Sequence, residues 1–407
     1  MTGIGANLYP WDVVGDPACP DRIAALGADR VTLAAAYHTV RALTPRHPEH
    51  KVVTAAHSAV YYRPDPHRWQ GSVLQPAEAA WSPRSFPKAA AALRTAGLKV
   101  YAWTVLVHNQ RLGTMHPQHA VTNAYGDVYP WALCANSPEV REYCARLAGE
   151  VAEQEDIDGI ELESCGWYGF DHLHAHDKTA GVALEPSTKQ LMNLCFCAAC
   201  VAQYADLGLA GLRADVRRAL DEVFAGRRAA AVPAPDVAGG LAAYTDGDAQ
   251  GGNSGDLGWH ALIAARRMRA EAAARLRAEA VAAVRRVRPD LPVLLHASAD
   301  PHAVGANPGC PPSPDSGAVL QCGVRSAAAL AAVREYADAA SRFDPPQPLA
   351  ATVNIVAGLG GARDDLAAWC TELRAAGADE LRFYHAGLAS AADLAAAAEA
   401  GRAFSAG

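Results

Sequence analysis

The stretch Asp158-Gly159-Ile160-Glu161-Leu162-Glu163 alternates two aliphatic side chains with two carboxylates. This period of two predicts a β-strand in which Ile160 and Leu162 point to one face and both glutamates to the other. The glutamates would lie about 6.6 Å apart along the strand. Buried carboxylates are costly unless they are paired, so we expect this strand to reach a functional site. The alternative is that Glu161 binds an arginine inside the fold and only Glu163 is accessible.

Similar short apolar runs recur along the 407 residues and alternate with Ala-, Leu- and Arg-rich stretches of helical period. This alternation is typical of repeated βα units. Eight strands with helical crossovers favour an α/β fold of the (β/α)8 TIM-barrel type over a doubly wound sheet. The expected strands lie near Gly3–Tyr9, Arg30–Ala35, Lys99–Thr104, Ile157–Glu163, Pro292–Ala297, Ala318–Cys322, Leu349–Ile355 and Glu380–His385. The expected helices are Pro20–Leu26, Pro87–Ala96, Ser137–Gln154, Trp259–Val287, Ala327–Phe343, Ala362–Ala376 and Ala391–Phe404.

Two long segments interrupt the alternation within what we expect to be one barrel domain over residues 1–407. Thr44–Pro87 is rich in Pro, His, Tyr and Trp, as a substrate-covering loop after the second strand would be. Residues 166–258 form a large insertion after the fourth strand. Its last part, 231–258, is rich in Ala, Gly and Pro, which predicts a flexible segment.

Three thiols lie close together in Cys195-Phe196-Cys197-Ala198-Ala199-Cys200, and a fourth, Cys134, lies upstream. The C-x-C-x-x-C spacing lets soft ligands share one metal ion, and a structural zinc site needs four ligands at about 2.3 Å. Four unrelated buried thiols are the alternative. A disulfide framework is disfavoured, because the chain is long and we see no secretion signal, so we expect a reducing, cytoplasmic location.

The segment Cys134-Ala135-Asn136-Ser137-Pro138 with Arg141, followed by C-x-C-x-x-C, resembles the zinc-cluster β-galactosidases of glycoside hydrolase clan A. The resemblance covers roughly the first half of the chain. It implies a (β/α)8 barrel, a structural zinc held by the four cysteines on the strand-four insertion, and an acid/base glutamate at Glu163. The family's nucleophile is a glutamate at the end of strand seven, where this chain has Asn354 and no acid. The family's double-displacement mechanism is therefore not carried over.

Three catalytic arrangements remain open. Glu163 is the acid, with Glu161 or Asp300 as the base for a water molecule; the substrate supplies the nucleophile; or a histidine moves the proton. Inversion needs carboxyls about 6.5–9.5 Å apart, and covalent catalysis about 5–5.5 Å. A like-charged Glu161–Glu163 pair would raise the pKa of one member, which suits a general acid.

Polar and aromatic residues follow most of the expected strands, where TIM barrels carry their active sites. Trp167 and Tyr168 suit stacking on sugar rings, with ordinary packing as the alternative. The sequence thus predicts an enzyme, a glycosidase-like hydrolase, that acts on a glycoside or sugar-like small molecule. The expected substrate-binding residues are Asn7, His38, Trp103, His108, Asn109, Trp167, Tyr168, His172, His174, His296, Gln321, Asn354, Tyr384 and His385.

Two other functions stay open. Alternating His172, His174 and His176 would bind a second divalent metal if their loop is extended, and together with His296 would support a lyase or isomerase acting on a polyhydroxy substrate. A catalytically inactive barrel that only binds carbohydrate would explain the missing strand-seven acid.

Composition limits the partners. The net charge of −7 argues against nucleic acid, and no apolar run is long enough to cross a membrane. The 51% hydrophobic content is ample for a large core, and the oligomeric state stays open, a homo-oligomer included.

Overall fold

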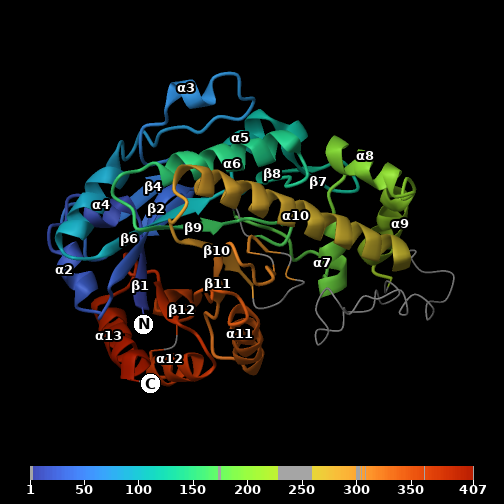
Figure 1. Cartoon of the computed structure of the whole chain (residues 1–407). Coiled ribbons are helices and arrows are strands. Elements are labelled where there is room, and N and C mark those ends of the chain that lie inside the picture. The colour runs from blue at the N-terminus through green and yellow to red at the C-terminus, as the bar shows by residue number, and fades with distance from the viewer. Residues whose placement is uncertain are drawn as a thin grey trace.

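Eight parallel strands close into a barrel in the computed structural model, which describes residues 3–172, 176–227, 259–298, 303, 305–307, 309–361 and 363–406. The strand order is β1-β13-β12-β11-β10-β9-β6-β2, and β2 pairs with β1 to close the ring. The predicted (β/α)8 fold is therefore confirmed (Figure 1). The barrel strands are β1 (Gly3–Leu8), β2 (Arg30–Tyr37), β6 (Lys99–Val105), β9 (Gly159–Glu163), β10 (Val293–Ala297), β11 (Gly317–Gln321), β12 (Leu349–Asn354) and β13 (Glu380–Tyr384).

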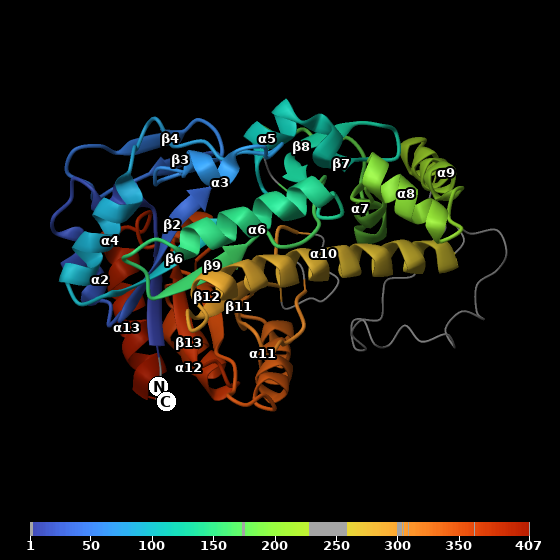
Figure 2. The same cartoon turned by 45° about the horizontal axis from the view of Figure 1, so that its top comes forward.

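Helices surround the barrel in the positions that the sequence predicts. They are α2 (Cys19–Ala24), α4 (Ser85–Thr95), α6 (Pro138–Ala152), α10 (Trp259–Val287), α11 (Ala327–Ala340), α12 (Leu366–Ala375) and α13 (Ala391–Ala406). The 29 residues of α10 span about 44 Å at 1.5 Å per residue. This helix therefore packs along α6 and continues beyond the barrel under the insertion (Figure 2).

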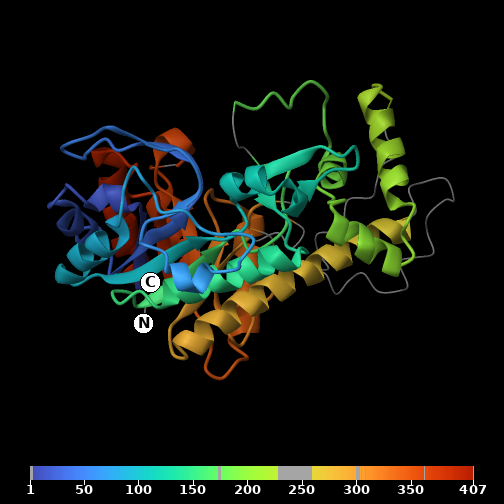
Figure 3. The same cartoon turned by 90° about the horizontal axis from the view of Figure 1, so that it is seen from above.

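The insertion after β9 contributes three helices: α7 (Pro186–Met192), α8 (Ala198–Asp206) and α9 (Leu212–Phe224). They lie beside a hairpin of β7 (Ala120–Thr122) and β8 (Val128–Leu133), which belongs to the loop after β6 (Figure 3). Two hydrogen bonds join the loops. The Phe196 N–H donates to the Thr122 carbonyl at 2.6 Å, and the Tyr129 hydroxyl donates to the Met192 carbonyl at 3.0 Å. The segment 231–258, predicted to be flexible, lies outside the described residues.

The expected covering loop Thr44–Pro87 contains regular structure. Its strand β4 (Val52–Ala55) forms a hairpin with β3 (Val40–Leu43), which directly precedes the loop; β5 (Ala59–Val60) adds an antiparallel strand to β2, and α3 (Pro66–Trp69) follows. The remaining short helices of the described residues are α1 (Pro10–Val13), α5 (Gln110–Met115) and the 3₁₀ turns η1 (Pro117–His119) and η4 (Ala357–Leu359). None of the described helices is long and apolar enough to span a bilayer.

Candidate active site and metal centre

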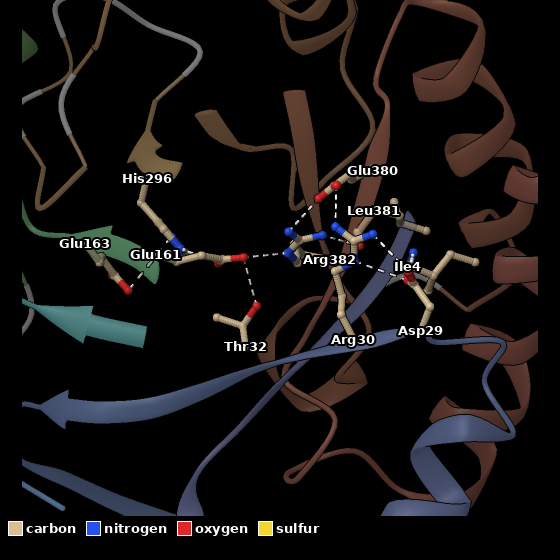
Figure 4. Close-up of polar contacts among 10 residues, drawn as sticks. All are labelled: Ile4, Asp29, Arg30, Thr32, Glu161, Glu163, His296, Glu380, Leu381 and Arg382. Carbon is tan, nitrogen blue, oxygen red and sulfur yellow. Dashed lines mark hydrogen bonds and ion pairs between the residues drawn. The ribbon is translucent and has the colours of Figure 1, made fainter. Parts of the chain in front are cut away.

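Both glutamates of β9 project into the barrel, as the alternation predicts. Ile160 and Leu162, which alternate with the glutamates along the strand, are fully buried. Glu161 reaches side chains on three other strands: Thr32 on β2, His296 on β10 and Arg382 on β13 (Figure 4). Glu163 lies two residues further along β9, at the carboxyl-terminal end of the strand.

Glu161 is 0% exposed and its carboxylate meets three partners. Arg382 Nε donates at 2.8 Å and Thr32 Oγ1 at 3.0 Å, while His296 Nε2 lies 3.0 Å away. Burial alone would raise the pKa of Glu161, but Arg382 and His296 outweigh it and lower the pKa to about 2. The carboxylate is therefore ionised, and Arg382, Thr32 and His296 all contact its two oxygens. This geometry matches the arginine-bound alternative and disfavours Glu161 as a catalytic base.

Glu163 has a partly accessible side chain, 16% exposed. Trp103 Nε1 donates to its Oε2, Asn307 Nδ2 donates to Oε1 at 3.4 Å, and His296 Nδ1 lies 3.9 Å from Oε2. The next residue, Ser164, has φ 57°, a left-handed conformation that is costly for a residue other than glycine. Its N–H donates to Asn307 Oδ1 at 3.3 Å, so Asn307 holds both the carboxylate and the backbone turn behind it.

Ion pairs continue below Glu161 toward the amino-terminal end of the barrel. Arg382 also donates to Glu380 at 2.7 Å, Glu380 pairs with Arg30, and Arg30 pairs with Asp29 at 2.9 Å (Figure 4). We call Arg30, Glu161, Glu380 and Arg382 the ionic column. It holds two positive and two negative charges in contact, which offsets the cost of burying each of them. Sequence analysis missed Arg382, although Glu380-Leu381-Arg382-Phe383-Tyr384 alternates as strand four does.

Aromatic rings pack around the Glu163 carboxylate. Tyr9 stacks on His385 at 4.2 Å between ring centroids, Tyr37 meets Trp103 edge-on at 4.7 Å, and Tyr384 lies 6.2 Å from Trp103. Burial lowers the pKa of His385 to about 3, so its imidazole is neutral, and its two ring nitrogens have no hydrogen-bond partner among the described residues. Tyr9 and Tyr37 were not among the predicted ligands, although each ends a barrel strand.

Several predicted ligands occupy other roles. Asn109 caps α5, where its Oδ1 accepts from the Leu112 N–H at 3.0 Å. Tyr168 is fully buried and donates to the Trp131 carbonyl at 2.8 Å, which matches the packing alternative.

Asn354 Oδ1 accepts from the Val356 N–H at 3.1 Å, so this amide shapes the loop after β12. The Arg269 guanidinium covers the Trp167 ring at 4.1 Å. Gln321 is exposed at the end of β11, and the buried Asn7 Oδ1 has no partner among the described residues.

A row of histidines leads from the barrel mouth toward the insertion. His38 stacks on His108 at 4.0 Å, and His108 meets His172 edge-on at 4.6 Å. His172 also lines a cavity of about 320 Å³ with Phe170, Asp171, Asp177 and Lys189. His176 is exposed and its Nε2 lies 3.3 Å from Lys178 Nζ. His174 and Asp300 lie outside the described residues, so the second metal site and the Asp300 base stay predictions.

The four cysteines of the sequence motif meet in space. Their sulfur atoms all lie within 4.8 Å of one another, and Cys134 and Cys200 are 3.5 Å apart. All four residues are buried. Backbone N–H groups of Thr122 and Cys197 point at Cys195 Sγ at 3.5 and 3.4 Å, an outer shell typical of thiolate sites. The geometry fits one tetrahedral metal ion.

The four cysteines come from two different loops of the barrel. Cys134 follows β8, in the loop after the third barrel strand, whereas the other three cysteines belong to the insertion after the fourth. A metal ion would therefore join the two loops that the hairpin and α8 already bring together.

Comparison with known proteins gives a structural likeness without a sequence match. No sequence-family profile matches the chain, and no curated protein matches it by sequence. Among solved structures, α-L-fucosidase isoenzyme 2 from Paenibacillus thiaminolyticus is 13% identical with a TM-score of 0.52, over 99% of this chain and 49% of the fucosidase. A catalytic mutant of a GH42 β-galactosidase from G. stearothermophilus is 11% identical with a TM-score of 0.54, over 99% and 56%.

A β-galactosidase from the psychrophilic Marinomonas ef1 is also similar, at 11% identity and a TM-score of 0.52, over 98% of this chain and 59% of that one. The chain thus spans about half the length of these enzymes. Likeness at such identities is a likeness of fold. The predicted resemblance to glycoside hydrolases is therefore confirmed for the barrel architecture.

Proposed function

We propose that this protein is a glycoside hydrolase in which Glu163 serves as the general acid/base. The observation that carries the proposal is the placement of Glu163: it is an accessible carboxylate at the carboxyl-terminal end of the fourth barrel strand, in a barrel with the architecture of glycosidases. Active sites of TIM barrels lie at this end of the strands.

The side chains around Glu163 fit the handling of a sugar ring. The partly exposed ring of Tyr384 offers apolar contact to C–H groups, whereas Trp103 is 1% exposed and contributes through its Nε1 bond to Glu163 rather than as a stacking face. Trp103 and Asn307 fix the carboxylate so that its proton is aimed at one point. In the proposed step, protonated Glu163 gives its proton to the glycosidic oxygen as the C–O bond breaks.

We also propose that the four-cysteine cluster holds a structural zinc ion. Four sulfur ligands complete the tetrahedral shell, so no position stays open for chemistry, and the metal would stabilise the two loops rather than take part in catalysis. Such thiolates persist in a reducing compartment, which fits a cytoplasmic protein with ten unpaired cysteines.

The test compares the protein with Glu163→Gln on two aryl glycosides of each sugar, one with a good and one with a poor leaving group. Loss of the acid should lower kcat/KM by about 10²–10⁴-fold on the poor leaving group and much less on the good one. Glu153→Gln, at a surface glutamate paired with Arg68, is the matched control. Equal losses on both substrates would contradict the assignment.

Non-catalytic carbohydrate binding is the second candidate function, and Asn354 favours it. This residue ends the seventh barrel strand with an amide that is bonded to its own loop. Under this alternative the parent protein binds sugars without turnover, and binding survives Glu163→Gln. The two functions are separated by product formation in the parent protein.

A further inference from the structure

We propose that His296 is the second proton-handling group of this site, that it shares one proton with Glu163, and that Glu161 is the positioning residue that orients it. The catalytic meaning of this pair rests on the proposed function. Its geometry does not, because the three side chains are in place whatever the substrate (Figure 4).

His296 lies between the two glutamates of β9. Its Nε2 is 3.0 Å from Glu161 Oε2, its Nδ1 is 3.9 Å from Glu163 Oε2, and it is 3% exposed. An ionised carboxylate only accepts hydrogen bonds, so Nε2 must carry a hydrogen. The neutral imidazole therefore carries no hydrogen on Nδ1, which lies 3.9 Å from Glu163 Oε2 and has no hydrogen-bond partner among the described residues. This is the arrangement in which a buried carboxylate fixes the tautomer of a catalytic histidine.

The charge of Glu163 and a proton on His296 are coupled, because the two groups lie 3.9 Å apart. Glu161 is already matched by Arg382, and Glu380 by Arg30, so the ionic column is neutral without His296. An imidazolium at His296 is therefore matched by Glu163 as a carboxylate, and a neutral imidazole by Glu163 as a carboxylic acid. These two states differ by one proton moved between Nδ1 and Oε2.

The other titratable groups that face this pair stay neutral. Tyr37 on β2, Tyr384 on β13, and Tyr168 and Cys165 in the loop after β9 all surround Glu163. Burial raises the pKa of each of them, to about 12 for Tyr384. Trp103, whose ring is parallel to His296 at 6.2 Å, carries no charge. Within the part of the chain that the structure describes, Glu161 is therefore the ionised group that contacts His296, with Arg382 behind it.

The pair supplies and recovers the proton of the acid step; it does not replace the missing seventh-strand acid, because its two groups lie only 3.9 Å apart. Glu163 gives a proton to the oxygen of the leaving alcohol as the C–O bond breaks, and the water that completes hydrolysis supplies the proton that the Glu163–His296 pair has lost. The proton then moves between His296 and Glu163 and restores the starting state. Protons balance, because one leaves with the alcohol and one arrives with water.

The experiment that tests the shared proton measures the protonation of His296 directly. Protein labelled with ¹³C at histidine Cε1 is titrated by NMR, and the His296 signal is assigned as the one missing from His296→Gln. We expect Glu163→Gln to lower the His296 midpoint by at least about 1 pH unit, because it removes the carboxylate that faces Nδ1. Glu153→Gln should leave the midpoint in place. A shift below about 0.2 unit in Glu163→Gln would overturn the shared proton.

Glu161→Gln tests the positioning role in the same spectra and in kinetics. The amide keeps acceptor and donor groups at this position but removes the charge. We expect the His296 midpoint to fall and the pH profile of kcat to shift by at least about 1 pH unit, with KM changed less than kcat. An unshifted midpoint would overturn the role of Glu161; should the variant not fold, the titration of Glu163→Gln decides the proposal by itself.

The outcomes separate this inference from the proposed function. Coupled titration of His296 and Glu163 in a protein that turns over no glycoside would support the pair and contradict the proposed glycosidase activity. Glycoside turnover that depends on Glu163, with no coupled titration of His296, would support the glycosidase activity and contradict the proton-sharing pair.

Discussion

The ionic column and the four-cysteine cluster are both buried polar groups, but they are completed differently. In the column, each charge of Arg30, Glu161, Glu380 and Arg382 contacts an opposite charge. In the cluster, four sulfur atoms gather within 4.8 Å of one another, and a thiolate set of this kind is neutralised by a cation. The column is thus completed by barrel closure alone, whereas the cluster offers four ligands that could hold a metal ion.

The two regions also differ in what they hold together. The column links β2, β9 and β13 inside a ring that backbone pairing already closes. The cluster links two loops outside that ring, where the structure offers fewer constraints. Losing the metal should therefore loosen the loops first, whereas losing a column charge should weaken the whole barrel.

The largest effect is expected from metal loss. Structural zinc sites bind with apparent free energies of about 10–16 kcal/mol in small domains, so Cys197→Ala should lower thermal stability sharply and reduce bound metal below one equivalent. Elemental analysis and thermal melts check this. Cys144→Ala, at a buried thiol outside the cluster, is the control for an ordinary cavity. Equal losses in the two variants would mean that the cluster is only packed thiols.

Removal of one column charge comes next. Arg382→Met removes the guanidinium shared by the buried Glu161 and Glu380 and leaves Arg30 as the one cation of the column, which should cost about 3–5 kcal/mol in the free energy of unfolding. Denaturant unfolding measures this loss. Arg382→Met combined with Glu161→Leu should recover part of it, because the second change removes an orphaned charge. Additive losses would show that the column is not an energetic unit.

Acid should weaken the column through Glu161. Its pKa is about 2 in the folded protein against an ordinary value of 4.5, so the folded state favours the ionised form. The stabilisation is present above pH 4.5 and is lost as the pH falls through 2. The difference amounts to about 3 kcal/mol. The unfolding free energy should therefore fall less steeply with acid in Glu161→Gln than in the parent protein; parallel curves would contradict the lowered pKa.

The smallest effect is expected at Asn109, a neutral buried polar group. Asn109→Ala removes the cap of α5, which should cost about 0.5–2 kcal/mol of stability. Because the amide is engaged in capping, KM for any substrate should change little. A large rise in KM with unchanged stability would restore Asn109 as a ligand.

The residues that sequence patterns located best are those whose signal is local. The alternation around Glu161 and Glu163, the helical periods and the C-x-C-x-x-C spacing each depend on neighbours along the chain, and they located the eight strands and the three clustered cysteines Cys195, Cys197 and Cys200. Asn109 and Tyr168 show the limit. A polar or aromatic residue after a strand has the same sequence signal whether it caps a helix, packs in the core or faces the mouth.

Thus the sequence by itself determined the barrel, the inward face of its fourth strand and the thiol motif, because strand and helix periods fix which side chains share a face. Only the tertiary structure decided the partners: that Arg382 saturates Glu161, that His296 lies between the two glutamates, and that Cys134 meets the other cysteines from a different loop. These pairings join strands far apart in the chain. They depend on the register in which the ring closes and on the packing of two loops against each other, which no local pattern encodes.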